Sequence, residues 1–129
     1  MNEADFATQV FVYDLESEAD LQERLCDLLR LKGYLVSHTH DSRYSEPGLP
    51  DIIAVGRKGG PAEGSLIVVE TKKGNAKLRL TTITKRGRYL PGQQDWLDAF
   101  AVVKKVEAMV VRTTDDWDSV VAKLTKEVL

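Results

Sequence analysis

The stretch Ser65-Leu66-Ile67-Val68-Val69-Glu70-Thr71-Lys72 decides the fold of this 129-residue chain. It is almost continuously apolar up to its charged end, which is typical of a central strand covered on both faces. Side chains at positions i and i+2 of a strand share a face, so Glu70 and Lys72 project to the same side. A charge at the end of a buried strand needs a partner or a function. The segment therefore predicts the middle of a sheet and a polar site at its end.

A second strand is expected over 50–56, closed by a glycine-rich turn that leads into 65–72. If these two strands pair as a hairpin, Asp51 near the start of the first lies close to Glu70 near the end of the second. Two neighbouring carboxylates repel each other and stay ionised best around a divalent cation, and hard oxygen ligands favour Mg²⁺ or Mn²⁺. Alone, Glu-x-Lys is more often a surface ion pair. The preceding Pro50-Asp51 favours the catalytic interpretation.

Helical spacing of apolar residues frames these strands. Ser17 before an acidic first turn, four leucines and a final Lys32-Gly33 predict a helix over 17–32. Strands follow at 34–38 and 107–112, a helix runs from Pro91 to about Lys105, and Thr114 caps a last helix. The residues expected to face the core from the last two helices are Trp96, Leu97, Phe100 and Val103, then Trp117, Val120, Val121 and Leu124.

The elements occur in the order αβββαβα, which predicts a three-layer α/β arrangement in a single domain over 1–129. Residues 1–16 form an N-terminal arm or strand. Residues 74–90 form a basic insertion, part of which is an extended arm.

Charge is distributed unevenly along the chain although its net value is only −2. Residues 1–51 hold eleven acidic and four basic side chains, whereas residues 52–94 hold two acidic and nine basic ones. A basic middle within an acidic frame suggests one face for a polyanion. A solvated loop rich in lysine and arginine is the alternative explanation.

Composition excludes several classes of protein. Cys26 is the only cysteine, so an intrachain disulfide and a multi-cysteine zinc site are excluded. No window approaches the roughly 20 continuous apolar residues of a membrane-spanning helix. The acidic N-terminus does not resemble a signal peptide, so we expect an intracellular, cytoplasmic protein with no membrane partner.

Pro50-Asp51, followed after eighteen residues by Glu70-Thr71-Lys72, resembles the PD-(D/E)xK nuclease motif. With Gly33-Tyr34 and Gly48-Leu49 before it, and Pro91-Gly92-Gln93 with Trp96-Leu97 after it, the chain is similar to the VRR-NUC (virus-type replication-repair nuclease) domain over roughly 17–125. The resemblance implies a restriction-endonuclease-like core, αβββαβ, with a mixed central sheet.

The resemblance also implies roles for individual residues. Asp51 and Glu70 would bind the metal together with the backbone carbonyl of Thr71, and Lys72 would be the catalytic lysine. Gln93 would lie near the scissile phosphate; Gln94 is its alternative. The glutamate of the first helix maps best onto Glu18 rather than Glu23, because Glu18, Gln22, Leu25 and Leu29 form one helical stripe.

The chain departs from short relatives between Lys72 and Gln93, where it inserts a longer stretch without an acidic residue. We expect this insertion to contact DNA phosphates. Its basic residues are Lys73, Lys77, Arg79, Lys85, Arg86 and Arg88. Arg43 and His38 could also touch DNA. His40 could also touch DNA, although histidines in such loops more often form hydrogen bonds within the loop.

The resemblance implies a hydrolase: a Mg²⁺- or Mn²⁺-dependent endonuclease that cuts branched DNA such as Holliday junctions during DNA repair and recombination. The small proteins that this chain resembles are phage-associated homodimers acting in a bacterial host. A two-fold dimer would supply the two active sites that symmetric junction cleavage needs. The alternatives are a nuclease trimming flaps, nicks or ends, a catalytically silent DNA-binding protein, and a regulatory protein-interaction domain.

Overall fold

A computed structural model describes residues 17–38 and 46–125. Its main sheet has the strand order β1-β2-β3-β6. β1 (Tyr34–His38), β2 (Ile52–Gly56) and β3 (Leu66–Lys72) are successively antiparallel, and β6 (Val106–Arg112) pairs with β3 in parallel. The predicted mixed sheet is therefore confirmed, with the 65–72 segment as one of its two inner strands. The arm or strand expected in 1–16, and the loop residues His40 and Arg43, lie outside the described residues.

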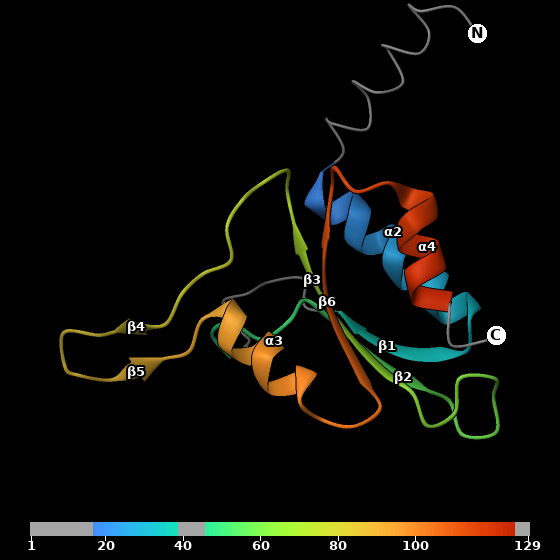
Figure 1. Cartoon of the computed structure of the whole chain (residues 1–129), viewed down its shortest axis with the longest axis horizontal. Helices are drawn as coiled ribbons and strands as arrows, with labels where there is room; N and C mark the ends of the chain where they lie inside the picture. The colour runs from blue at the N-terminus through green and yellow to red at the C-terminus, as the bar shows by residue number, and fades with distance from the viewer. Residues whose placement is uncertain (1–16, 39–45, 126–129) are drawn as a thin grey trace, which may run out of the picture.

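Helices cover both faces of this sheet (Figure 1). α2 (Glu18–Leu31) and α4 (Trp117–Thr125) lie on one face, and α3 (Gln93–Ala101) lies on the other. The predicted three-layer α/β arrangement and the order αβββαβα are confirmed. Within the described ranges, no helix is both long and apolar enough to cross a membrane.

The side chains of β3 alternate between the two faces of the sheet, so this strand packs against both helical layers. Ile67 and Val69 belong to the apolar core shared with α2, whereas Val68 between them is fully buried on the opposite face. Thr71 therefore continues the α2 face, while Glu70 and Lys72 continue the α3 face. The end of β3 places polar groups in both layers at once.

The ends of α2 follow the sequence closely. The Ser17 hydroxyl accepts a hydrogen bond from the Asp20 amide at 3.0 Å, as a helix cap should. Gly33 has a φ of 97°, a left-handed conformation that glycine adopts without strain and that ends the helix. Both predicted boundary signals are confirmed.

Two predictions about the later helices are wrong. α3 ends at Ala101 rather than near Lys105, and Val103 is exposed instead of buried. The β-branched pair Val102-Val103 favours the helix weakly, and the chain must turn there into β6. The last helix is capped by Asp116, whose Oδ2 accepts a hydrogen bond from the Ser119 amide at 3.1 Å, and not by Thr114.

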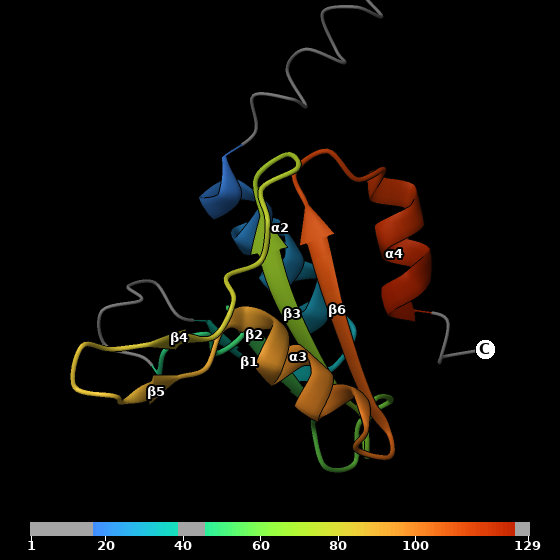
Figure 2. The ribbon, with the colours of Figure 1, turned by 60° about the vertical axis from the view of Figure 1, so that its left-hand side comes forward.

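The basic insertion forms a two-stranded arm that projects from the body of the molecule (Figure 2). β4 (Thr82–Ile83) and β5 (Tyr89–Leu90) pair antiparallel in a separate sheet. The turn between them is closed by a hydrogen bond from the Thr84 amide to the Arg88 carbonyl at 2.9 Å. The expected extended arm is thus an antiparallel ribbon.

Candidate active site

The strand register brings Asp51 and Glu70 to the same end of the sheet. Ile52 pairs with Val69, so Asp51 and Glu70 occupy opposite positions just beyond the last pair of the two strands. Asp51 Oδ2 accepts two hydrogen bonds from Thr71, one from the backbone amide at 3.0 Å and one from the hydroxyl at 2.8 Å. Asp51 is therefore held in a fixed place beside the end of β3.

Glu70 is a buried carboxylate with one unused oxygen. Its side chain is 1% exposed. Oε1 accepts a hydrogen bond from Gln93 Nε2 at 2.7 Å, whereas Oε2 is buried with no hydrogen-bond partner among the described residues. Burial, reinforced by the negative charge of Asp51, raises the pKa of Glu70 to about 8. A shared proton or a cation between the two carboxylates would relieve this cost.

The oxygen atoms at this end of the sheet could hold a hard divalent cation such as Mg²⁺. The described part of the chain contains no cluster of three or more His, Cys, Asp or Glu side chains suited to a metal. Mg²⁺, however, commonly uses only one or two carboxylates and completes its shell with other oxygen atoms. Asp51, the unused Glu70 oxygen and the Thr71 backbone carbonyl could supply oxygen atoms of this kind.

Glu18 and Lys72 complete the charged cluster from opposite sides. Glu18 Oε1 lies 3.4 Å from the Thr71 hydroxyl, at the start of α2. Burial, followed by the charge of Asp51, raises the pKa of Glu18, while the Lys72 ammonium lowers it. Lys72 acts in the same direction on the pKa of Glu70. The lysine charge therefore lies near both glutamates.

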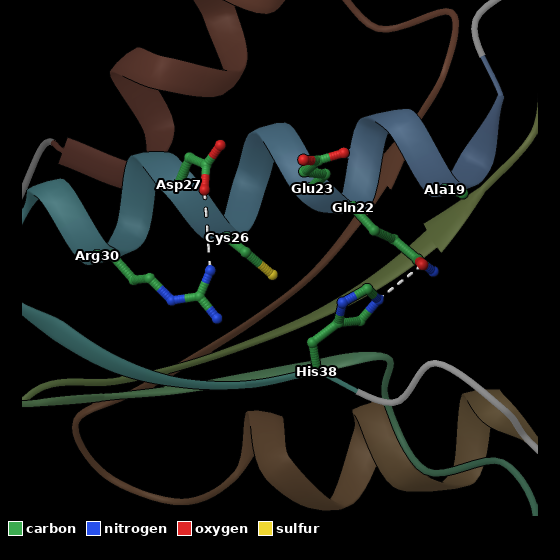
Figure 3. Close-up of a pocket in the computed structure, with 7 residues that line it drawn as sticks. All are labelled: Ala19, Gln22, Glu23, Cys26, Asp27, Arg30 and His38. Carbon is green, nitrogen blue, oxygen red and sulfur yellow. Dashed lines mark hydrogen bonds and ion pairs between the residues drawn. The ribbon is translucent and has the colours of Figure 1, made fainter.

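A chain of hydrogen bonds extends from Asp51 across the α2 face, and Figure 3 shows its far end, where Gln22 meets His38. Gln22 Nε2 donates to the Thr71 hydroxyl at 2.7 Å, and that hydroxyl donates to Asp51. Gln22 Oε1 lies 2.8 Å from His38 Nε2. Because an amide oxygen only accepts, His38 must carry its proton on Nε2 in this arrangement. Every donor in the chain then points toward the Asp51 carboxylate.

Gln22 and His38 also line a groove of about 490 Å³ along α2. Cys26 lies in its wall, but burial raises the pKa of this thiol, which disfavours the reactive thiolate. Asp27 and Arg30 form an exposed ion pair at 3.8 Å in the same wall. Gln22 and His38 therefore belong both to the wall of this groove and to the hydrogen-bond chain that leads to Asp51.

Gln93 links Glu70 to the base of the arm. Its Nε2 donates to Glu70, and its Oε1 accepts from the Arg79 backbone amide at 2.8 Å. Gly92 lies against the same segment: a Cβ placed there would come within 2.3 Å of the Arg79 carbonyl oxygen. A Cβ at Gly48 would come within 2.6 Å of the Gly92 backbone. Three backbone segments thus meet where only glycine fits.

The structure distinguishes between the alternatives that the sequence left open for the other site residues. Gln94 bonds Asp98 at 2.8 Å, so Gln93 is the glutamine that touches the carboxylate cluster. Glu23 is exposed and Glu18 is the glutamate near Thr71. His38 is half-buried and faces Gln22. The six basic residues expected to contact DNA, which are Lys73, Lys77, Arg79, Lys85, Arg86 and Arg88, are all exposed.

Comparison with protein-family models, with curated proteins and with solved structures gave no match for this chain.

Sequence analysis missed the part that Gln22 plays at the site. The indication was present, because Gln22 is a polar residue on the stripe that otherwise faces the core through Leu25 and Leu29. A polar group at such a position is expected to find a buried partner. The contact of Asp95 with Thr81 was also missed, since it joins α3 to the arm across fourteen residues.

Proposed function

We propose that this chain is a metal-dependent, structure-specific DNA endonuclease that hydrolyses phosphodiester bonds in branched DNA. The observation that carries the proposal is the meeting of Asp51, Glu70 and Lys72 at one end of the sheet, with one Glu70 oxygen buried and unused. An unpaired buried carboxylate is costly, and such groups concentrate at functional sites. The exposed basic arm beside this cluster supplies the contacts that a polyanion needs.

Each residue of the cluster has a distinct task in this proposal. Asp51, Glu70 and the Thr71 carbonyl would hold Mg²⁺ or Mn²⁺, which supplies an acidified water and a positive charge beside the scissile phosphate. Lys72 stabilises negative charge on the attacked phosphate or helps to remove the proton from water. Gln93 fixes the orientation of the Glu70 carboxylate, and the Thr71 amide fixes that of Asp51.

The test is cleavage of end-labelled four-way junction, flap and linear duplex by the purified protein, with Mg²⁺, Mn²⁺ or EDTA. We expect symmetric cuts in the junction that require the metal. Cutting confined to flaps, nicks or ends would keep the active site and assign a trimming function. If the protein binds these DNAs without cutting any of them, a catalytically silent DNA-binding protein is favoured. If it neither binds nor cuts DNA, a protein-interaction domain is favoured.

Single substitutions test which residues carry out the cleavage. Glu70→Gln or Lys72→Ala should lower the cleavage rate by at least about 100-fold while DNA binding is largely kept, because each changes a group assigned to the metal or to the attacked phosphate and leaves the basic arm intact. Lys58→Ala is the control, since Lys58 is an exposed lysine just beyond the other end of β2. If Glu70→Gln and Lys72→Ala cut DNA as fast as the Lys58→Ala control and the parent, the assignment of the site is wrong.

The proposal includes a homodimer acting on intracellular, cytoplasmic DNA. Symmetric cutting of two strands needs two active sites related by a two-fold axis, and residues 17–38 and 46–125 of one chain offer a single carboxylate pair of this kind. Sedimentation with and without junction DNA measures the mass. A monomer under both conditions would contradict the dimer without touching the active-site assignment.

A further inference from the structure

The arm carries exposed apolar side chains among its cations. Ile83 and Tyr89 are direct cross-strand partners, so their side chains share one face of the ribbon. Ile83 is 72% exposed and Tyr89 is 61% exposed. The tip beside them carries Lys85, Arg86 and Arg88, all exposed. An apolar pair in a cationic rim is the chemistry of side chains that enter between nucleic-acid bases while neighbouring cations bind phosphates.

The charge of the arm favours DNA over a second copy of its own ribbon as the occupant. Residues 73–90 contain six basic side chains and no acidic one. Two arms packed face to face would bring like charges together, whereas a polyanion complements them. Unstacking a base costs least at a branch point, nick or end, so such a pair gains access to bases most easily there.

The base of the arm is fixed relative to the catalytic cluster. The Arg79 amide is bonded to Gln93, which is bonded to Glu70, and Thr81 is bonded to Asp95 of α3. Gly92 packs against the backbone of Arg79 with no room for a side chain. A group held by the arm is therefore held at a set position from the carboxylates.

We propose that Ile83 and Tyr89 form an apolar wedge that contacts unstacked bases at a DNA branch point, with Lys85, Arg86 and Arg88 on the flanking phosphates. This inference rests on the proposed action on DNA and names the feature of the substrate that is recognised. The wedge selects branched over continuous duplex, and the fixed base of the arm places a strand near Glu70.

The experiment measures binding of the full chain in EDTA, so that no cleavage is needed. A four-way junction carries 2-aminopurine at the branch point, and a linear duplex carries it at the centre. We expect 2-aminopurine fluorescence to rise on binding to the junction alone. Tyr89→Ala should weaken junction binding about 5- to 30-fold, because base stacking on an aromatic ring is lost. It should also suppress the rise, because the wedge no longer separates the 2-aminopurine from the bases on which it stacks. Binding to linear duplex should stay within twofold.

Three variants serve as controls. Tyr89→Phe keeps the ring and should retain junction preference. Val102→Ala removes an 84% exposed apolar side chain outside the arm and should change nothing. Arg86→Gln removes a phosphate contact and should weaken junction and duplex binding alike. Ile83→Ala repeats the test on the partner of Tyr89.

The outcomes separate the wedge from the nuclease. If Tyr89→Ala and Ile83→Ala bind the junction like Val102→Ala, the wedge is contradicted even where the parent cuts DNA. If the parent unstacks the junction but never cuts it, the wedge stands and the nuclease proposal fails. If Tyr89→Ala turns a dimer into a monomer and keeps the ratio of junction to duplex affinity, the pair is a protein interface and the wedge is contradicted.

Discussion

Thr71 connects the two layers of the molecule at the site. Its amide and hydroxyl both donate to Asp51, and its hydroxyl accepts from Gln22 on the α2 face. Its neighbour Glu70 projects to the α3 face, where Gln93 holds it. The alternation of a single strand thus lets one helix position Asp51 and another position Glu70.

Removing the Gln22 amide tests the part played by the α2 layer. Gln22→Ala breaks the bonds to Thr71 and His38 and frees the hydroxyl that orients Asp51. We expect Mn²⁺ affinity and cleavage rate to fall about 10- to 100-fold, as is usual for residues that orient metal ligands. Glu23→Ala, on the adjacent exposed position, should bind Mn²⁺ normally. Equal Mn²⁺ affinity in the two variants would contradict the orienting role.

Glu70 should make stability depend on pH. Its pKa is about 8 in the folded protein, against a usual value of 4.5. Between these values the folded state holds a proton that the unfolded state has lost. The free energy of unfolding in EDTA should therefore fall as pH rises from about 4.5 to about 8, by up to about 1.4 kcal/mol per pH unit.

Urea denaturation across this pH range measures the effect. Glu70→Gln carries a neutral amide and should flatten the slope, whereas Glu63→Gln, at an exposed position, should keep it. An unchanged slope in Glu70→Gln would assign the pH dependence to another group.

The proximity of Asp51 and Glu70 was predictable from the sequence, because pairing of the two strands around a short turn fixes which residues meet. The bonds of Gln22 to Thr71 and of Gln93 to Arg79 were not. They join residues forty-nine and fourteen positions apart. Such bonds depend on how a helix is seated on the sheet, which no local pattern specifies.

At the scale of elements, two glycines with the same positive φ should respond differently to substitution. Gly48 and Gly59 both have a φ of 79°, a left-handed conformation that costs alanine roughly 1–2 kcal/mol. A Cβ at Gly59 meets nothing within 4 Å, whereas one at Gly48 would meet the Gly92 backbone at 2.6 Å.

Gly48→Ala should therefore lower the free energy of unfolding by roughly 1 to 3 kcal/mol more than Gly59→Ala does. Chemical denaturation of both variants measures the difference. Equal losses would mean that the loop before Asp51 can move away from α3 at no cost.

Long or fully buried elements were predictable, and short exposed ones were less so. α2 and β3 have strong periodicity or a continuous apolar run, and the structure gives them the expected bounds within about one residue. β4 and β5 have two residues each, and their pairing depends on the turn at 84–88. The end of α3 was misplaced because Val102 and Val103 continue the apolar composition without contacting the core.

At the scale of the molecule, the separation of charge predicts how DNA binding depends on salt. Lys85, Arg86 and Arg88 belong to the arm, which projects away from α2 (Figure 1), whereas the first turn of α2 is acidic. Arg86→Gln and Arg88→Gln should each reduce the slope of log K against log salt by about one, because each releases one phosphate contact. Lys123→Gln, on the exposed side of α4, should leave the slope unchanged. Salt titration of junction affinity measures all three, and equal slopes would exclude the arm from the DNA interface.

The arm lies within the connection between two parallel strands, β3 and β6, and this has a consequence for how the fold can diversify. Such strands cannot be joined by a tight turn, so residues 73–105 form a long crossover in any case. The entropy of closing a loop grows only logarithmically, and doubling its length costs about 0.6 kcal/mol. Ribbons of other lengths can therefore be inserted before Gly92 while Glu70 and Lys72 keep their places. The reach of the protein along its substrate can change independently of the strand that does the chemistry.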